Sequence, residues 1–107
     1  MNMTLAANAP WTTSATDPPP TLEIAGLKQT VILSWNQFVY AEGAEDEIRI
    51  AFASHDVVVR GAGLDRLLNA IAAHRVVSIR QSMRAELFTD KATRFISEIE
   101  VRKIEEK

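Results

Sequence analysis

The 107-residue chain contains no cysteine, four glycines, four prolines and two histidines. Without cysteine it cannot form a disulfide framework, a zinc–thiolate site, an iron–sulfur cluster or a cysteine nucleophile. It also has no excess of one charge, since 12 Lys and Arg face 14 Asp and Glu, for a formal net charge of −2. This balance excludes a strongly basic nucleic-acid binder and a polyacidic solvating chain.

Long apolar runs are missing as well. No stretch reaches the 18 consecutive apolar residues of a membrane-spanning helix, and the first ten residues hold neither a basic residue nor a signal-peptide core. We therefore expect a cytoplasmic protein with no membrane partner. The hydrophobic fraction of 47% and charged fraction of 24% are ordinary for one folded domain.

The prolines mark the division of the chain, because Pro10 and the run at residues 18–20 all precede residue 21. The sequence predicts a flexible Pro/Ser/Thr-rich arm over residues 1–21 and a single α+β domain over residues 22–107. Trp11 stands alone in this polar arm. It is a candidate docking residue for a partner, or it packs onto the chain's own domain.

Two segments after the arm predict strands. Residues 21–24 alternate between polar and apolar side chains. Residues 31–40 are β-branched and aromatic, which favours a strand with a bulge near Asn36, and a short buried helix remains the alternative. Trp35, Phe38 and Tyr40 form an aromatic cluster in this segment. Their neighbours are acidic or neutral, so we expect core packing rather than a stacking platform for nucleic-acid bases.

Residues 47–54 and 57–60 predict a hairpin with a two-residue turn at His55–Asp56, which would place Phe52 opposite Val59. The alternation assigns one face of the hairpin to the core. The opposite face includes a small apolar patch, which is a candidate self-interface. The predicted core face is Ile48, Ile50, Phe52, Val57 and Val59, and the predicted self-interface is Ala51, Ala53 and Val58.

A helix follows over residues 64–75, with an apolar stripe at helical spacing along one side that we expect to pack on the sheet. The stripe consists of Leu64, Leu67, Leu68, Ile71 and Ala72. Beyond it, residues 76–88 alternate, with Val77 and Ile79 on one face, and residues 95–102 alternate as well. The two segments predict a long antiparallel hairpin. Two registers remain open for this hairpin. One pairs Glu86 with Arg94 and Arg80 with Glu100, and the other pairs Arg84 with Glu98.

Together these elements predict an α+β fold. A small antiparallel sheet of about five strands would carry one amphipathic helix packed on it. A barrel-like closure of the sheet is a possible variant. A domain of about 85 residues buries a modest share of its surface, so self-association to a homo-oligomer is expected.

Candidate chemistry is sparse. Ser54, His55 and Asp56 are adjacent, but successive strand side chains point to opposite faces, so a turn is a better interpretation than a catalytic triad. His74 near the end of the helix suits the helix dipole without any site. Gly61 and Gly63 fit a strand-to-helix bend better than a phosphate loop. The acidic cluster of Glu42, Glu45, Asp46 and Glu47 does not have the spacing of a calcium loop. The sequence thus predicts no catalytic, cofactor-binding or metal-binding residues.

Charge is divided unevenly along the chain. Residues 1–59 carry a net charge of −5 and residues 60–107 a net charge of +3. Arg75, Arg80, Arg84 and Arg94 are the candidate face for anions or nucleic acid, because guanidinium groups suit phosphate. Cross-strand Arg–Glu pairs on a solvated sheet face are the competing interpretation.

The leading functional hypothesis is a non-enzymatic binding or scaffolding module that acts through self-association or a protein partner. Weak nucleic-acid or anion binding through the arginines is the second hypothesis. A small enzyme using His55 or His74 is the third, and no nucleophile or metal site supports it in the sequence.

Overall fold

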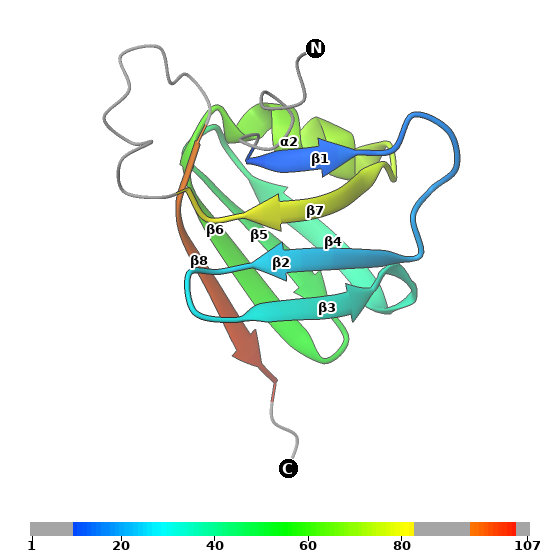
Figure 1. Ribbon diagram of the computed structural model, residues 1–107, viewed down its shortest axis with the longest axis horizontal. Coiled ribbons are helices and arrows are strands. Elements are labelled where there is room, and N and C mark those ends of the chain that lie inside the picture. The colour runs from blue at the N-terminus through cyan, green and yellow to red at the C-terminus, as the bar shows by residue number, and fades with distance from the viewer. Residues whose placement is uncertain (1–9, 83–94, 105–107) are drawn as a thin grey trace.

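Two four-stranded β-sheets face each other in the computed structural model, which describes residues 10–82 and 95–104 (Figure 1). The first sheet has the strand order β1-β7-β2-β3, and the second has the order β4-β5-β6-β8. The first sheet comprises β1 (Trp11–Thr13), β7 (Val76–Arg80), β2 (Thr21–Ala25) and β3 (Thr30–Ser34). The second comprises β4 (Phe38–Gly43), β5 (Glu47–Phe52), β6 (His55–Ala62) and β8 (Phe95–Lys103), and helix α2 (Leu64–Ala72) connects β6 to β7.

The prediction of an α+β fold with one helix and mostly antiparallel strands is confirmed, but the expectation of one sheet of about five strands is wrong. The described strands form two sheets, and they do not close into a barrel. The chain changes sheet three times, and these changes cause the difference. It passes from the first sheet to the second between β3 and β4, returns to the first between β6 and β7, and passes to the second again between β7 and β8. Pairing is antiparallel except between β2 and β7, which run parallel.

The first change of sheet occurs at a single turn of 3₁₀ helix, η1 (Trp35–Gln37). The Ser34 side chain accepts a hydrogen bond from the Asn36 backbone N–H, which caps this turn. The Trp35 indole N–H donates to the Val76 carbonyl at 3.1 Å and ties the corner to β7. Residues 31–40 are therefore neither one bulged strand nor a buried helix, but two strands joined by a turn.

The β5–β6 hairpin exists, but its turn differs from the prediction. Ile50 pairs with Val57 and Ile48 with Val59, so the chain turns at Ala53–Ser54 and His55 already belongs to β6. The predicted pairing of Phe52 with Val59 is wrong. The observed pairing is displaced from the predicted pairing by an even number of residues, so every side chain remains on its predicted face of the sheet. The predicted core face of this hairpin is accordingly buried.

The predicted hairpin between residues 76–88 and 95–102 is wrong in the described residues. β7 pairs with β1 and β2, whereas β8 pairs with β6, with Glu98 opposite Arg60 and Glu100 opposite Val58. Arg80 therefore does not lie opposite Glu100. The alternative pairings involve Arg84, Glu86 and Arg94, which lie outside the described residues.

Strand β7 departs from its predicted alternation at Val77. A register shift against β1 places Val77 outside the regular pairing, so that Val76 and Ile79 are both buried while Val77 is 37% exposed. A bulge of this kind moves the following side chains to the other face. The prediction that Val77 and Ile79 share a face is therefore wrong.

Part of the predicted arm lies within the first sheet. Trp11 lies opposite Ile79 in the β1–β7 pairing and packs against the hydrophobic core. The Thr12 and Ser78 hydroxyls are 2.7 Å apart, and Arg75 Nη1 donates to the Ser14 carbonyl at 3.0 Å. Of the two interpretations of Trp11, the structure supports packing onto its own domain. Residues 1–9 lie outside the described residues, and the division into arm and domain stays a prediction.

The core fills the space between the sheets, and α2 covers one end of it (Figure 1). Leu64, Leu67 and Ile71 of α2 are buried, as their helical spacing predicts. The helix ends at Ala72 rather than at residue 75. The remaining buried apolar residues of the core come from both sheets: Leu22, Ile24, Leu33, Ile48, Ile50, Phe52, Val57, Val59, Val76, Ile79 and Ile96.

Candidate functional site

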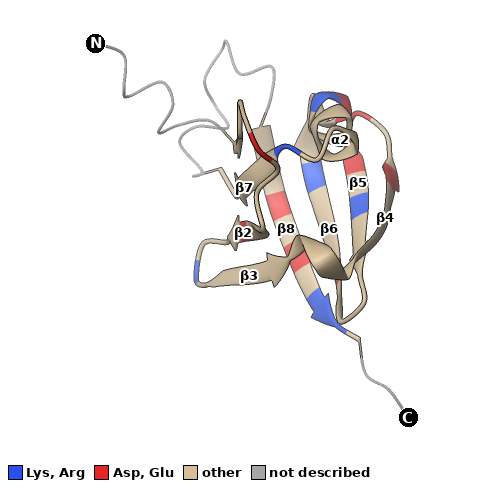
Figure 2. Ribbon diagram, turned by 90° about the vertical axis from the view of Figure 1, so that its right-hand side faces the viewer, with Lys and Arg blue, Asp and Glu red and all other residues tan. Residues whose placement is uncertain are grey.

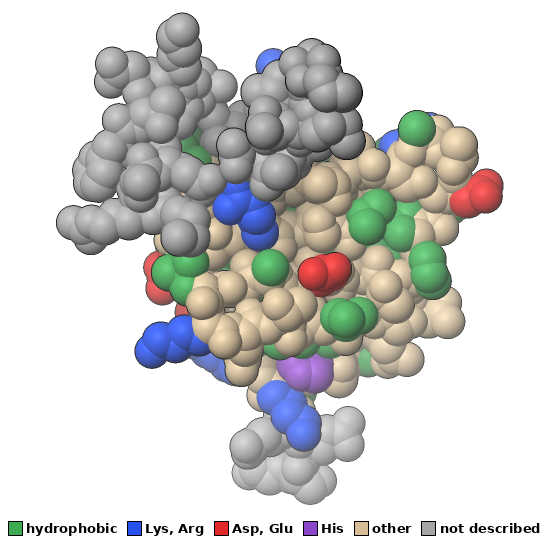
Figure 3. Space-filling model, in the orientation of Figure 1, with side chains coloured by type: hydrophobic (Ala, Val, Ile, Leu, Met, Phe, Trp, Pro, Cys, Tyr) green, Lys and Arg blue, Asp and Glu red, His purple; other side chains and the backbone are tan. Residues whose placement is uncertain are grey.

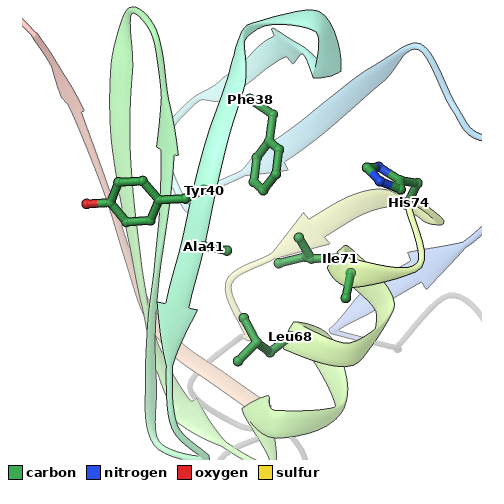
Figure 4. Close-up of a pocket in the computed structure, with 7 residues that line it drawn as sticks. Phe38, Tyr40, Ala41, Leu68, Ile71 and His74 are labelled. Atoms are coloured by element: carbon green, nitrogen blue, oxygen red, sulfur yellow. The ribbon is translucent and has the colours of Figure 1, made fainter.

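An apolar groove runs between strand β4 and helix α2 (Figure 4). In this view Phe38 and Ala41 point from β4 toward the helix, and Leu68 and Ile71 point back toward the strand. The Tyr40 ring points the other way. The groove has a volume of about 350 Å³. Its lining consists of Phe38, Tyr40, Ala41, Leu68, Ile71, Ala72 and His74.

A bulge in β4 creates the strand side of this groove. Phe38 lies opposite Phe52 and Tyr40 opposite Ala51, so Val39 is an extra residue in the pairing. Because of this extra residue, Phe38 and Ala41 both face inward although they are three positions apart. Val39 is 60% exposed as a result.

Strand β4 is the end strand of its sheet among the described strands. The Ala44 N–H donates to the Glu47 carbonyl at 2.8 Å, which fixes the direction of the backbone groups near this turn. Since these directions alternate along a strand, the N–H and C=O of Ala41 and Gly43 point away from β5. A sheet edge of this kind is a template for pairing with another chain.

The acidic cluster predicted from sequence lies beside the far end of β4. Glu42, Asp46 and Glu47 contribute to a second hollow of about 470 Å³ at the β4–β5 turn. Figure 2 shows acidic positions on both β4 and β5. Gly43 has φ of +151° at this turn, and a Cβ there would collide with the Glu47 carbonyl and with Ile48. The turn therefore requires glycine, and it presents negative charge next to the apolar groove.

His74 lies in the groove for a conformational reason. It follows the end of α2 with φ of 58°, in the left-handed region that glycine usually occupies after a helix. Its N–H donates to the Ile71 carbonyl at 2.9 Å, which closes the last turn. Its place beside Phe38 was not predicted from sequence, where it was interpreted through the helix dipole alone.

We expect His74→Gly to stabilise the fold by about 0.5–1 kcal/mol, because glycine adopts this φ without steric cost. Urea unfolding followed by circular dichroism measures the change. A His74→Ala variant serves as the control, since it keeps a Cβ in the strained conformation and should show no gain. Equal stability of the two variants would contradict the explanation.

The outer face of the second sheet carries ion pairs rather than an apolar patch. Arg49 Nη2 lies 2.9 Å from Asp56 Oδ2, and this carboxylate raises the pKa of the Arg49 guanidinium. Arg60 lies within 4 Å of three carboxylates, with Glu98 the nearest at 3.2 Å. The remaining partners are Glu47, Glu100 and Arg102. The interpretation of a salt-bridged, solvated sheet face thus applies to this sheet, though with different arginines from those expected.

The predicted self-interface lies on this same face and does not form a continuous apolar surface. Ala51 is 6% exposed and offers little area to a partner. Val58 is half-buried in a hollow lined by Arg49, Asp56 and Arg60, while Ala53 is exposed at the hairpin turn. The self-interface at these three residues stays a prediction.

The tripeptide Ser54–His55–Asp56 does not assemble into a relay. Ser54 Oγ and His55 Nδ1 are 2.7 Å apart, but both side chains are solvent-accessible. The Asp56 carboxylate is held by Arg49 on the outer face of the sheet. A triad needs the histidine between the other two groups, and Asp56 is engaged elsewhere.

Of the four arginines predicted to form an anion or nucleic-acid face, the structure describes two. Arg75 immediately precedes β7 and Arg80 is its last residue, so the two arginines lie at opposite ends of this strand. Arg75 is engaged with the Ser14 carbonyl. Arg84 and Arg94 lie outside the described residues, and the hypothesis of nucleic-acid binding stays a prediction.

The glycines at 61 and 63 have separate structural roles. Gly63 precedes α2 with φ of 69°, and Gly61 lies opposite Ile96 in the β6–β8 pairing, against the backbone of Phe95 and Ile96. Within the described residues no three His, Asp or Glu side chains are grouped to hold a metal ion. No helix in the same part of the chain is long and apolar enough to cross a membrane.

The groove itself was not found from sequence. Leu68 and Ala72 belong to the helical stripe and were interpreted as core residues, and Tyr40 was placed in the aromatic core although it is 41% exposed. Trp35 and Phe38 do pack against Phe52, with ring centroids 5.6 and 6.0 Å from it. The sequence did hold one signal for the groove, namely the width of the apolar stripe. A helix of nine residues is too short to bury every residue of so wide a stripe against the sheets, so some apolar side chains remain accessible.

The chain matches no protein-family model, no curated protein and no solved structure.

Proposed function

We propose that the protein is a non-enzymatic binding module that takes an extended segment of a partner protein as an added strand beside β4. The groove between β4 and α2 is the observation that carries this proposal. It combines an apolar floor with the end strand of a sheet, and these are the two components of recognition by strand addition.

The backbone of β4 supplies the first component. The outward N–H and C=O of Ala41 would pair with one residue of the added segment, and that residue would exchange two hydrogen bonds with Ala41. Residues directly opposite each other in a sheet share a face. The side chain opposite Ala41 would therefore enter the groove, between Phe38 and Leu68.

The adjacent position of the segment would meet a different environment. A residue opposite Glu42 would point to the outer face of the sheet. On that face Glu42 lies opposite Arg49 of β5, and the acidic β4–β5 turn begins there. Opposite charges directly across a strand pair are favourable. The ligand class is thus an extended segment with an apolar residue next to a basic residue.

The proposal is tested by selecting a displayed library of short random peptides against the full chain. Selected peptides should share an apolar residue with Lys or Arg at the next position. A library that yields no binder, or binders without this pattern, would overturn the proposal. Isothermal titration with one synthetic selected peptide and one scrambled version then gives the affinity.

Two substitutions separate the two components of the site. Ala41→Pro removes an outward N–H that makes no bond to β5, so the sheet keeps its own hydrogen bonds. We expect peptide affinity to fall about tenfold, because a backbone hydrogen bond of about 1 kcal/mol is lost and the proline ring obstructs the edge. Leu68→Glu places a charge on the groove floor and should lower the affinity at least as much.

The matched control is Leu27→Glu, since Leu27 is 61% exposed in the turn between β2 and β3, away from the groove. It should bind the selected peptide like the unmodified chain. Circular dichroism of all three variants checks that each is folded. Equal loss in the control would mean that added negative charge, not the groove, changes binding.

A further inference from the structure

Among the described strands, β3 forms the edge of the first sheet opposite β1, and its sequence lacks the residues that usually protect a sheet edge. Its sequence Thr30-Val31-Ile32-Leu33-Ser34 contains no charged residue, no proline and no glycine. Natural edge strands are commonly blunted by such residues, because unpaired edges recruit other chains. Ile32, at the centre of the strand, is 62% exposed. Figure 3 shows separate hydrophobic side chains exposed on the face of the molecule that the first sheet forms.

The hydrogen bonds on the other side of β3 show which backbone groups face this edge. The Trp35 N–H donates to the Pro20 carbonyl at 3.0 Å, and the Gln29 carbonyl accepts from Gly26 at 2.9 Å. Odd-numbered residues from 29 to 35 therefore point toward β2. By alternation, the N–H and C=O of Thr30, Ile32 and Ser34 point away from β2, toward the edge.

The strand is also complementary to itself. In an antiparallel pair centred on Ile32, Ile32 lies opposite Ile32 of the second copy, Val31 opposite Leu33, and Thr30 opposite Ser34. Each opposed pair matches in polarity, and the outward backbone groups meet in hydrogen-bonded pairs. Lys28 would lie opposite Asn36 in this register, so no like charges face each other.

We propose that two copies of this chain associate through their β3 strands about a two-fold axis at Ile32. The dimer joins the two first sheets into one continuous sheet and covers the exposed Ile32 side chains with each other. Self-complementarity is the requirement of a two-fold interface, since the same patch must serve both subunits. A partner of different sequence would not need it. The β4 groove is not used, so this inference is independent of the proposed function.

The test is sedimentation velocity of the full chain from micromolar to millimolar concentration, at low and high salt. We expect a monomer–dimer equilibrium that resists salt, because no charged residue lies in Thr30–Ser34. Ile32→Lys places like charges opposite each other and should raise the dimer dissociation constant about tenfold or more. Ile32→Pro removes an outward N–H and should have a similar effect with no added charge.

Two controls make the result specific. Leu27→Lys adds the same charge at an exposed apolar residue outside the strand and should dimerise like the unmodified chain. Ala41→Pro alters β4, which is an edge strand of the second sheet, and this variant should also dimerise like the unmodified chain. Circular dichroism confirms the fold of each variant, and hydrogen exchange of the Ile32 amide should slow as concentration rises.

Three outcomes overturn the proposal. These are a monomer at all concentrations, a dimer that Ile32→Pro leaves unchanged, and a dimer that Ala41→Pro abolishes. The last would place self-association at β4. Should one Ile32 variant fail to fold, the other variant and the exchange rate of the Ile32 amide in the unmodified chain decide the question.

Discussion

Phe52→Ala is expected to destabilise the protein by about 3–5 kcal/mol, the range measured for removing a buried aromatic side chain. Phe52 is 1% exposed and is the largest fully buried side chain of the described core. It contacts the rings of both Trp35 and Phe38, so the substitution leaves a cavity at the corner where the chain changes sheets. The neighbouring strands are held by hydrogen bonds and cannot close this space.

Urea unfolding monitored by tryptophan fluorescence and circular dichroism measures this loss, because Trp35 lies beside the cavity. Val39→Ala is the matched control: it also truncates an apolar side chain of this region, but Val39 is 60% exposed. Its effect should stay within about 0.5 kcal/mol. A loss below about 1 kcal/mol for Phe52→Ala would show that the aromatic cluster does not anchor the core.

Gly61→Ala is expected to destabilise the protein by about 2–3 kcal/mol, through overpacking rather than through a cavity. A Cβ on Gly61 would collide with the Phe95 carbonyl and lie 3.0 Å from the Ile96 Cα. These are backbone atoms of β8, which cannot move aside without shifting the β6–β8 pairing. The pairing already changes register between Arg60 and Gly61.

Gly26→Ala is the matched comparison, because its Cβ would meet the Gln29 carbonyl at 3.3 Å, a contact that a small adjustment relieves. The same urea titration should rank Gly61→Ala well below Gly26→Ala in stability. Equal losses would contradict this explanation, because the entropy of the unfolded chain favours alanine over glycine at both positions and only the contact at Gly61 is severe.

Local patterns predicted the elements of the fold well. The alternation of residues 47–52 and 57–59 identified the buried face of the second sheet, and the spacing of Leu64, Leu67 and Ile71 identified the buried side of α2. These patterns are local because a side chain's face follows from its position along its own strand or helix. The errors concern which strands pair and where the pairing shifts.

The candidate groove shows why the site was not predicted. It depends on the Val39 bulge, on the end position of β4 and on the packing of α2 beside that strand, and none of these has a local sequence signal. The acidic turn at residues 42–47 was visible as a charge cluster. Its position next to an apolar groove was not.

The sequence by itself determined the absence of thiol chemistry, the balance of charge, the α+β class and most of the buried faces. These properties follow from composition and from the periods of strand and helix. Only the tertiary structure decided that the strands form two sheets, that Trp11 belongs to one of them, and that β3 and β4 end the sheets. Pairing joins segments far apart in the chain, and the same alternating strand satisfies its buried face in either sheet.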